Sequence, residues 1–390
     1  MAKNNRWLLP DGVEEILPKQ AWQIESFQRQ ALDLYRSWGY ELIIPPLIEY
    51  SESLLIAMGS DMDLQTFKLT DQLSGRTLAI RADITPQTAR IDAHGWPQSG
   101  PSRFCYIGTV VRTKPKTQLS SRLPIELGAE LYGDASLHSD QEAISLMLAT
   151  IALAGVERVH LDLGHLGIYR GLVAATGLAA DQITLLTDAF ERKAATEVKQ
   201  ILCENLSDQK LIDMLAALVE LNGDLSVLAK AKTILADAPA AVRQALEDLD
   251  TIAQWVSQRF PDTPIVLDLA EIRAYSYHSG LIFAAYIDGV GHSVANGGRF
   301  DGIGKAFGRS RPATGFTVSV NTLLPQIFAE QDDDLIIAPH SDDTALEQCI
   351  ADLRAQGKRV VRELPDAGKP SNCGYQLVLQ EGEWQIQALN

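Results

Sequence analysis

The pattern of apolar and polar positions predicts a β-hairpin between Phe104 and Gly133. In this stretch, FCYIGTVVRTKPKTQLSSRLPIELGAELYG, two apolar runs are joined by a polar loop, as in two paired strands. The predicted strands carry Arg112 on the first arm and Glu126 and Glu130 on the second. Because side chains alternate along a strand, Glu126 and Glu130 project from one face. These charges form either a pocket for a phosphate or a ligand with an amine and a carboxylate, or a solvated face with an ion pair.

Helical and extended segments precede and follow this hairpin. Apolar residues at helical spacing, followed by Gly39, predict a helix over Pro18–Trp38. The pair Pro45-Pro46 predicts that Tyr40–Tyr50 is extended. Further predicted elements are strands over Leu64–Thr70, Arg76–Ala82 and Arg158–Leu163, a helix capped by Thr85 with Pro86 as its first residue, and a helix over Ser139–Ala154. Arg81 and Asp83 then fall at a strand-to-helix junction, where ligand-facing groups are common.

The middle of the chain changes character. From about Gly164 to Phe260 it is rich in alanine and leucine, and helices are predicted over Asp181–Asn205, Asp208–Leu221, Leu225–Ala236 and Ala240–Arg259. We expect a core over residues 1–330, a helical insertion within it over 170–262, and a small C-terminal α/β domain over 331–390. The last of these has a β-α-β pattern followed by a hairpin, after a linker at Asp332–Asp334.

Composition narrows the classes of function. The chain has 390 residues, 46% hydrophobic and 22% charged, and no apolar run long enough to span a membrane or serve as a signal peptide. Its four cysteines form no CxxC pair, so neither a disulfide framework nor a zinc site is expected, and a cytoplasmic location fits. The formal net charge of −16, from 34 basic and 50 acidic residues, makes nucleic acid an unexpected partner.

Two glycine-rich signals fail on spacing. Lys305 in GGRFDGIGKAFG is followed by Ala306 rather than Ser or Thr, so the segment is not a phosphate-binding loop, and its glycines miss the dinucleotide spacing. No HExxH pattern is present, and we expect neither a metal nor a cofactor. The loop EIRAYSYHSG is more informative, because Arg273, Tyr275, Tyr277 and His278 crowd a short turn. It either recognises a small polar molecule or is a surface loop whose tyrosines pack on the core.

These segments resemble, in order, the motifs of class II aminoacyl-tRNA synthetases, and most closely histidyl-tRNA synthetase. Tyr40–Tyr50 is similar to motif 1, the dimer-forming strand, and Phe104–Gly133 is similar to motif 2. IRAYSYHSGLIFAA resembles the histidine-specific motif VRGLDYYxxTVFE, and GGRFDG resembles GGRYDG. The resemblance covers about residues 5 to 325. It implies an α+β fold, with a class II synthetase-like antiparallel sheet flanked by helices.

The same resemblance implies a binding site for histidine. Arg112 matches the arginine that holds the α-phosphate and carboxylate, and Glu126 and Glu130 match a glutamine and a glutamate that face the amino acid. RADITPQTAR places Asp83 and Thr85 where a carboxylate and a hydroxyl meet it. The implied contacts are Glu130 or Asp83 to the α-amino group, Arg112 to the carboxylate, and Glu126, Arg273 and Tyr277 around the imidazole, with Thr85, Tyr275 and His278 also in the site.

Departures from the synthetase motifs concern the nucleotide. Motif 3 is GFxxGxER, but this chain has GFTVSVNT, so Thr322 replaces the arginine that clamps the ATP triphosphate. Threonine cannot make that bidentate contact. Lys114 stands where an ATP-contacting glutamate is expected, and Ser120 replaces a basic residue. Ser276 and Ala284 replace an aspartate and a glutamate of the histidine motif. Adenylation is therefore expected to fail, and residues 331–390 are too few for a whole anticodon-binding domain.

This combination resembles the family of ATP phosphoribosyltransferase regulatory subunits, which acts in the first step of histidine biosynthesis. The resemblance implies a subunit without catalytic residues that activates the short-form catalytic subunit and mediates feedback inhibition by histidine as allosteric ligand. It also implies a homodimer within a hetero-oligomer, with a hetero-octamer as the expected assembly. Two alternatives stay open: an active histidyl-tRNA synthetase, and a synthetase-like protein that senses uncharged tRNA.

Overall fold

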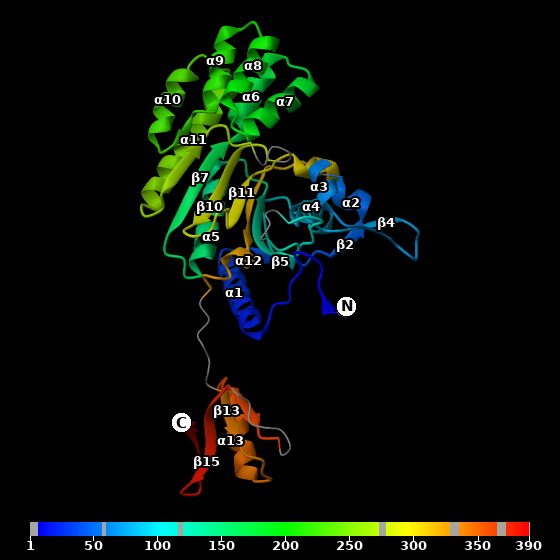
Figure 1. Cartoon of the computed structure of the whole chain (residues 1–390), viewed down its shortest axis with the longest axis vertical. Helices are drawn as coiled ribbons and strands as arrows, with labels where there is room; N and C mark the ends of the chain where they lie inside the picture. The colour runs from blue at the N-terminus through cyan, green and yellow to red at the C-terminus, as the bar shows by residue number, and fades with distance from the viewer. Residues whose placement is uncertain are drawn as a thin grey trace, which may run out of the picture. The chain divides into compact units, whose positions relative to one another are not determined.

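A mixed, largely antiparallel sheet organises the first 328 residues (Figure 1). The computed structural model describes residues 7–56, 60–115, 120–272, 278–327, 335–364 and 372–389. The strand order is β1 (Glu41–Leu42), β5 (Ser102–Thr109), β6 (Ile125–Tyr132), β12 (Ala313–Ser319), β11 (Ala295–Arg299), β10 (Leu281–Ile287), β7 (Val159–His165), β9 (Ile265–Asp268) and β8 (Asn222–Gly223). Only the β1–β5 and β7–β9 pairs of this sheet are parallel. The predicted α+β architecture is confirmed.

The predicted hairpin is formed by β5 and β6, which pair antiparallel over their full lengths. β6 is a central strand because β12 pairs with its other side, where Gly315 lies opposite Glu130. Side chains of β6 alternate between two faces, as its sequence predicts. Leu127 and Ala129 join the main hydrophobic core, so Glu126 and Glu130 project from the opposite face.

Two long helices pack against the core side of this sheet. α5 (Leu137–Ala152) crosses β6, β11 and β12, and α1 (Pro18–Ser37) packs against α5, β1 and β5. The predicted helix at Pro18 is confirmed, since the proline occupies the first turn, where its missing N–H costs no bond. Tyr35 of α1 is fully buried, with its ring 6.1 Å from that of Phe316 on β12. This packing leaves the opposite face of β6 and β12 available for a cavity.

A smaller sheet lies beside the first, in the order β2 (Ile48–Tyr50), β4 (Thr77–Ile80) and β3 (Lys68–Thr70). The neighbouring helices are α2 (Ser51–Leu55), α3 (Ser60–Gln65), α4 (Thr85–Arg90) and the π-helical turn Ile91–Gly95. The prediction of a strand from Leu64 was wrong in its first residues. The hydroxyl of Thr66 donates to the carbonyl of Met62 (2.7 Å), which closes a last helical turn before β3 begins.

The start of α4 also differs from its prediction. Thr85 is the first helical residue rather than the cap, and Ile84 precedes it without a side-chain capping bond. Asp83 supplies the bond instead, because its Oδ1 accepts from the backbone N–H of Thr85 (2.9 Å). This bond fixes Asp83 beside the helix N-terminus, where negative charge is favoured.

Helices fill the chain between β7 and β9: α6 (Leu166–Thr176), α7 (Ala180–Glu191), α8 (Ala195–Asn205), α9 (Gln209–Leu218), α10 (Ser226–Ile234) and α11 (Ala240–Arg259). The predicted helix over Ala240–Arg259 is confirmed, but the one over Asp181–Asn205 is two helices. Lys193 separates them with a left-handed φ of 52°. Its ammonium donates to both oxygens of Asp268 (2.7 Å each), which ties this turn to the end of β9.

Residues from Ala329 onward form a second unit with its own four-stranded sheet. The order is β14 (Val360–Arg362), β13 (Leu335–Ala338), β15 (Cys373–Gln380) and β16 (Glu383–Ala388). β15 and β16 form the predicted terminal hairpin. α13 (Thr344–Ala355) packs on one face, where Leu346 and Ile350 meet Ile336 and Leu377 in a small core. Two short elements complete the first unit, the 3₁₀ turn Ile303–Phe307 and α12 (Val320–Leu323).

Candidate functional site

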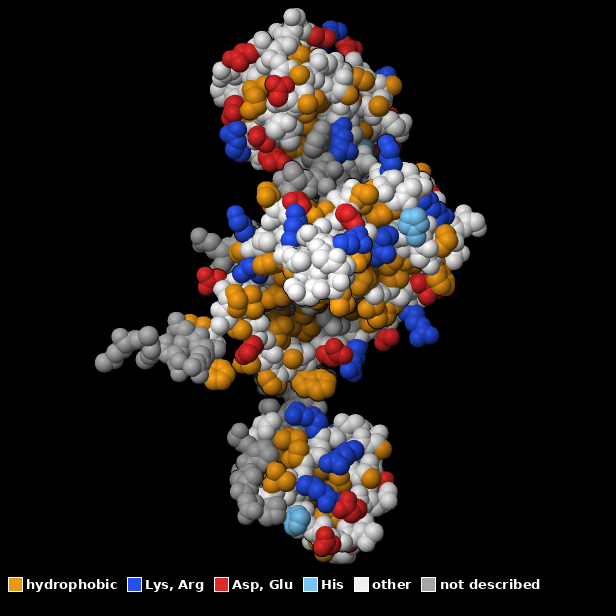
Figure 2. Space-filling view, turned by 90° about the vertical axis from the view of Figure 1, so that its right-hand side faces the viewer, with side chains coloured by type: hydrophobic (Ala, Val, Ile, Leu, Met, Phe, Trp, Pro, Cys, Tyr) orange, Lys and Arg blue, Asp and Glu red, His pale blue; other side chains and the backbone are white. Residues whose placement is uncertain are grey.

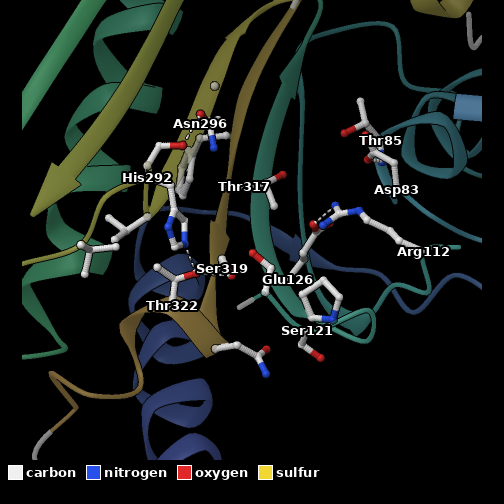
Figure 3. Close-up of a pocket in the computed structure, with 18 of the residues that line it drawn as sticks. Asp83, Thr85, Arg112, Ser121, Glu126, His292, Asn296, Thr317, Ser319 and Thr322 are labelled. Carbon is white, nitrogen blue, oxygen red and sulfur yellow. Dashed lines mark hydrogen bonds and ion pairs between the residues drawn. The ribbon is translucent and has the colours of Figure 1, made fainter. Parts of the chain in front are cut away.

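A cavity of about 690 Å³ opens on the face of the main sheet that carries Glu126 and Glu130 (Figure 3). Six of the nine residues predicted for the site line it: Asp83, Thr85, Arg112, Glu126, Glu130 and His278. They come from three separate parts of the chain: the start of α4, the hairpin of β5 and β6 with its loop, and the residues just before β10. The other three, Arg273, Tyr275 and Tyr277, lie outside the described residues.

Glu130 is the most deeply buried charged group of the cavity, with 1% of its surface exposed. Its Oε2 accepts a hydrogen bond of 2.5 Å from the hydroxyl of Tyr132. Its Oε1 is buried and makes no hydrogen bond. Burial raises the pKa of Glu130 to about 8, although the nearby hydroxyls of Tyr132 and Thr85 act in the opposite direction. A buried carboxyl oxygen without a hydrogen-bond partner indicates a position for a ligand group.

Arg112 and Glu126 form an ion pair at the same wall. Nη2 of Arg112 lies 2.5 Å from Oε1 of Glu126, and the two residues are 9% and 7% exposed. This bond engages one nitrogen of the guanidinium, which has five N–H donors in all. Arg112 can therefore hold Glu126 and still present donors to a ligand carboxylate.

The N-terminal segment is joined to Arg112 through Arg122. The backbone N–H of Arg112 donates to the carbonyl of Arg122 (2.9 Å), and the backbone N–H of Arg122 donates to the carbonyl of Gly12 (2.7 Å). Nε of Arg122 also donates to the carbonyl of Arg112 (3.1 Å). Two residues after Gly12, Glu14 lines the cavity, so this segment contributes to the site.

The wall opposite Arg112 carries neutral polar groups (Figure 3). The hydroxyl of Thr322 donates to Ser319 Oγ (3.0 Å) and lies 3.5 Å from Nε2 of His292. Asn321 Oδ1 accepts from the backbone N–H of Ile125 (2.7 Å), which holds the start of β6. Where the synthetase motif has an arginine, this chain therefore has Thr322, which is hydrogen-bonded within the wall.

Sequence reasoning missed four residues of the cavity lining: His292, Asn296, Thr317 and Ser319. Nothing in their spacing distinguishes them from ordinary strand and turn residues.

The charge of the cavity is acidic. Among the described lining residues, Glu14, Asp83, Glu126 and Glu130 are acidic, and Arg112 is the one arginine or lysine. A triphosphate needs cations or a metal to offset its charge. The described parts of the chain contain no cluster of three or more His, Cys, Asp or Glu side chains suited to a metal ion. The excess of acidic over basic side chains among these lining residues suits an amine-bearing ligand better than a triphosphate.

The GGRFDG segment has a structural role. Arg299 is 8% exposed and pairs with Asp140, which is fully buried at the start of α5, at 2.6 Å. It also donates to Ser139 Oγ and to the carbonyls of Asp134 and Ser136. The next residue, Phe300, lines the cavity. Arg299 therefore fixes the turn between β6 and α5, while its neighbour shapes the site.

The raised pKa of Glu130 predicts how stability depends on pH. The native state holds a proton on Glu130 between about pH 4.5 and about pH 8, while the unfolded chain does not. Unfolding free energy from this group therefore falls as pH rises through that window, by about 1.4 kcal/mol per pH unit. Glu130→Gln removes this loss, so its stability relative to the wild type improves from pH 5.5 to pH 8.

Urea unfolding at several pH values measures that difference. Glu220→Gln, at an exposed position on the surface, is the control and is expected to parallel the wild type. An unchanged difference between Glu130→Gln and the wild type over this range would show that Glu130 is ionised in the native state.

Comparison with known proteins identifies the family. The model for histidyl-tRNA synthetase matches residues 12–323, and the model for the ATP phosphoribosyltransferase subunit HisZ C-terminal domain matches residues 333–387. An ATP phosphoribosyltransferase regulatory subunit from Pseudomonas fluorescens (strain Pf0-1) is 52% identical over 395 residues, covering 100% of both chains. One from Stutzerimonas stutzeri is 50% identical with the same coverage. The chain belongs to the family of ATP phosphoribosyltransferase regulatory subunits.

Solved structures agree with this family. A protein from Bacillus halodurans, described as an ATP phosphoribosyltransferase regulatory subunit/histidyl-tRNA synthetase, has a TM-score of 0.82 and 25% identity, covering 95% of this chain and 96% of that one. Histidyl-tRNA synthetase from Nostoc sp. PCC 7120 has a TM-score of 0.77 at 17% identity, covering 98% of this chain and 97% of that one, which shows the shared fold. The predicted family is confirmed. Its members are named as regulatory rather than catalytic subunits, and the alternative of an active synthetase is not favoured.

Proposed function

We propose that this regulatory subunit activates the short-form catalytic subunit of ATP phosphoribosyltransferase and inhibits it when histidine fills the cavity. The observation that carries the proposal is the buried Oε1 of Glu130, which makes no hydrogen bond in an otherwise acidic cavity. Histidine inhibits only if it binds the inhibited arrangement more tightly, and coupling of about 1–3 kcal/mol gives effects of about 5- to 150-fold.

The cavity suggests how histidine lies within it. Glu130 is deeply buried and bonded to Tyr132, whose ring packs against that of Phe300 at the cavity. We therefore place the imidazole there rather than the α-amino group. Asp83 then accepts from the α-ammonium, and Arg112 donates to the carboxylate. Thr85 and Glu126 complete this wall. Arg273, Tyr275, Tyr277 and His278 remain predicted contacts of the same ligand.

We propose a homodimer through the segment that resembles motif 1. β1 is the edge strand of the main sheet, and the residues after it expose large apolar side chains, with Ile44 85% and Leu47 44% accessible. Arg81 and Gln87 hold this segment by donating to the carbonyls of Pro45 (2.9 Å) and Pro46 (2.7 Å). Hydrophobic side chains also gather on the visible face of the larger unit (Figure 2). Exposed apolar surface on a fixed backbone is typical of an interface.

The assembly and the location of the complex are also proposals. We propose that such dimers combine with the catalytic subunit into a hetero-octamer in the cytoplasm, and that tRNA is not a partner. No helix in the described ranges is both long and apolar enough to cross a bilayer. The formal charge of −16 opposes binding to a polyanion.

Reconstitution tests the proposed function. The purified chain is mixed with the short-form catalytic subunit, and turnover is measured with and without histidine. We expect turnover to rise when this chain is added and to fall when histidine follows. Histidine-dependent ATP–pyrophosphate exchange by the chain alone is expected to be absent, because Thr322 offers no clamp for a triphosphate. Clear exchange, or turnover that ignores both additions, would contradict the proposal.

A further inference from the structure

Tyr132 lies behind the wall of the cavity, two residues beyond Glu130 on β6. It is 2% exposed, and its hydroxyl makes a hydrogen bond of 2.5 Å to Oε2 of Glu130. Burial holds the pKa of Tyr132 well above its ordinary value, so the hydroxyl stays protonated and acts as the donor. One oxygen of the buried carboxyl is therefore always engaged from the protein side.

The ring of Tyr132 is held between two other rings. Its centroid lies 6.1 Å from that of Phe104 and 6.0 Å from that of Phe300, both in edge-to-face arrangements. Phe300 contacts the ring of His278 in the same way at 6.3 Å, and both of these residues line the cavity. Because the rings of Phe104, Tyr132 and Phe300 pack in one small hydrophobic cluster, the hydroxyl of Tyr132 has a fixed position.

Space around Glu130 is limited on the side of β12. A Cβ atom added at Gly315 would lie 2.8 Å from Cγ of Glu130, so the glutamate side chain occupies space that only a glycine leaves open. Together with the bond from Tyr132, this packing gives the carboxyl group one arrangement. Oε2 accepts from Tyr132, and Oε1 is left without a hydrogen-bond partner.

We infer that Tyr132 is a positioning residue for histidine: its hydroxyl fixes Oε2 of Glu130 and stabilises the carboxylate, so that Oε1 accepts a hydrogen bond from the imidazole N–H. This inference rests on the proposed binding of histidine. The inference goes beyond that proposal because it assigns a role to Tyr132, a residue that does not contact the ligand.

The direction of the pH effect follows from the groups around Glu130. They are Glu126 and Tyr132 on β6, Tyr106 on β5, Asp83 and Thr85 at the start of α4, Arg112 after β5, and His278 beside Phe300. β12 contributes Gly315, which carries no charge. Histidine binding through the carboxylate requires Glu130 to lose its proton, so affinity rises as pH approaches 8. Removing the Tyr132 hydroxyl disfavours the carboxylate and moves this rise to higher pH.

Calorimetric titration with histidine from pH 6.5 to pH 8.5 tests the inference on the full chain. For Tyr132→Phe we expect about tenfold weaker binding than wild type at pH 7, because a hydrogen bond to a charged group is lost. The difference in affinity between Tyr132→Phe and the wild type becomes smaller as pH rises. The ligand's own ionisations are common to all variants, so the difference between profiles reports on Glu130.

Tyr40→Phe is the matched control. The hydroxyl of Tyr40 also donates to a carboxylate, Oε1 of Glu142 at 3.0 Å, but Arg103 holds that carboxylate as well. Neither Tyr40 nor Glu142 lines the cavity. Its affinity and pH profile are expected to match those of the wild type.

The outcomes separate this inference from the proposed function. If the wild type binds histidine and Tyr132→Phe binds equally well, or more weakly by one factor at every pH, the role of Tyr132 is refuted and the proposed ligand stands. If the wild type does not bind histidine, both the inference and the proposed function fail.

Should Tyr132→Phe not fold, Glu130→Gln serves instead, since it keeps an acceptor for Tyr132 but cannot ionise. Its affinity is expected to lose the rise with pH, and a rise like that of the wild type would overturn the inference.

Discussion

At pH 8, where the carboxylate of Glu130 is populated, half-maximal inhibition of the assembled Glu130→Gln enzyme requires about 10- to 100-fold more histidine than that of the wild type. Glutamine has nearly the same shape but no charge, so it exchanges a charge-assisted hydrogen bond for a neutral one. Hydrogen bonds to charged groups contribute about 1.5–3 kcal/mol, and each 1.4 kcal/mol is a factor of ten. By linkage, weaker histidine binding must appear as a weaker response of the complex.

Two measurements check this result: calorimetry of histidine with the variant alone, and inhibition curves of the complex with the catalytic subunit. The exposed Glu220→Gln variant is expected to behave as wild type in both. Unchanged affinity of Glu130→Gln would remove Glu130 from the proposed site, whatever the inhibition curve shows.

Arg299→Met is expected to destabilise the chain by about 3–5 kcal/mol. Asp140 is fully buried, and Arg299 offsets its charge at 2.6 Å. Removing one partner of a buried ion pair leaves the other charge in an apolar surrounding, which is costly. Burial already raises the pKa of Asp140 despite Arg299, so the variant is expected to hold that carboxyl protonated at neutral pH.

Urea unfolding of single and double variants measures this effect. The double variant Arg299→Met, Asp140→Leu is expected to recover most of the loss, since a buried pair is replaced by apolar groups. Arg103→Met is the control, because its pair with Glu142 is partly exposed and such pairs contribute about 0–1 kcal/mol. Equal losses in Arg299→Met and Arg103→Met would contradict the assigned role.

Local patterns predicted much of the fold. The hairpin of β5 and β6 followed from two apolar runs around a polar loop. The helix over Ala240–Arg259 followed from an apolar stripe at helical spacing, with Pro239 marking its start. In these cases the signal lies within one stretch of sequence. The side on which Glu126 and Glu130 project followed from alternation alone.

Other features depend on contacts between distant residues. Lys193 interrupts a helix that its neighbours favour, and its ammonium bonds Asp268, 75 positions away. The pair of Arg299 and Asp140 spans 159 positions. Neither has a local signature. Within the site, resemblance located Glu130 and Arg112, but the neutral wall around His292 and the hydroxyl of Tyr132 emerged only once the strands were assembled.

The link from Gly12 through Arg122 to Arg112 has a practical consequence for work with this protein. The segment around Gly12 is hydrogen-bonded to the loop that carries Arg112, and Glu14 reaches the cavity. A truncation through Glu14 would remove the carbonyl of Gly12 that accepts from Arg122, and it would remove Glu14 from the lining of the cavity. Binding measurements are best made on protein that keeps both Gly12 and Glu14.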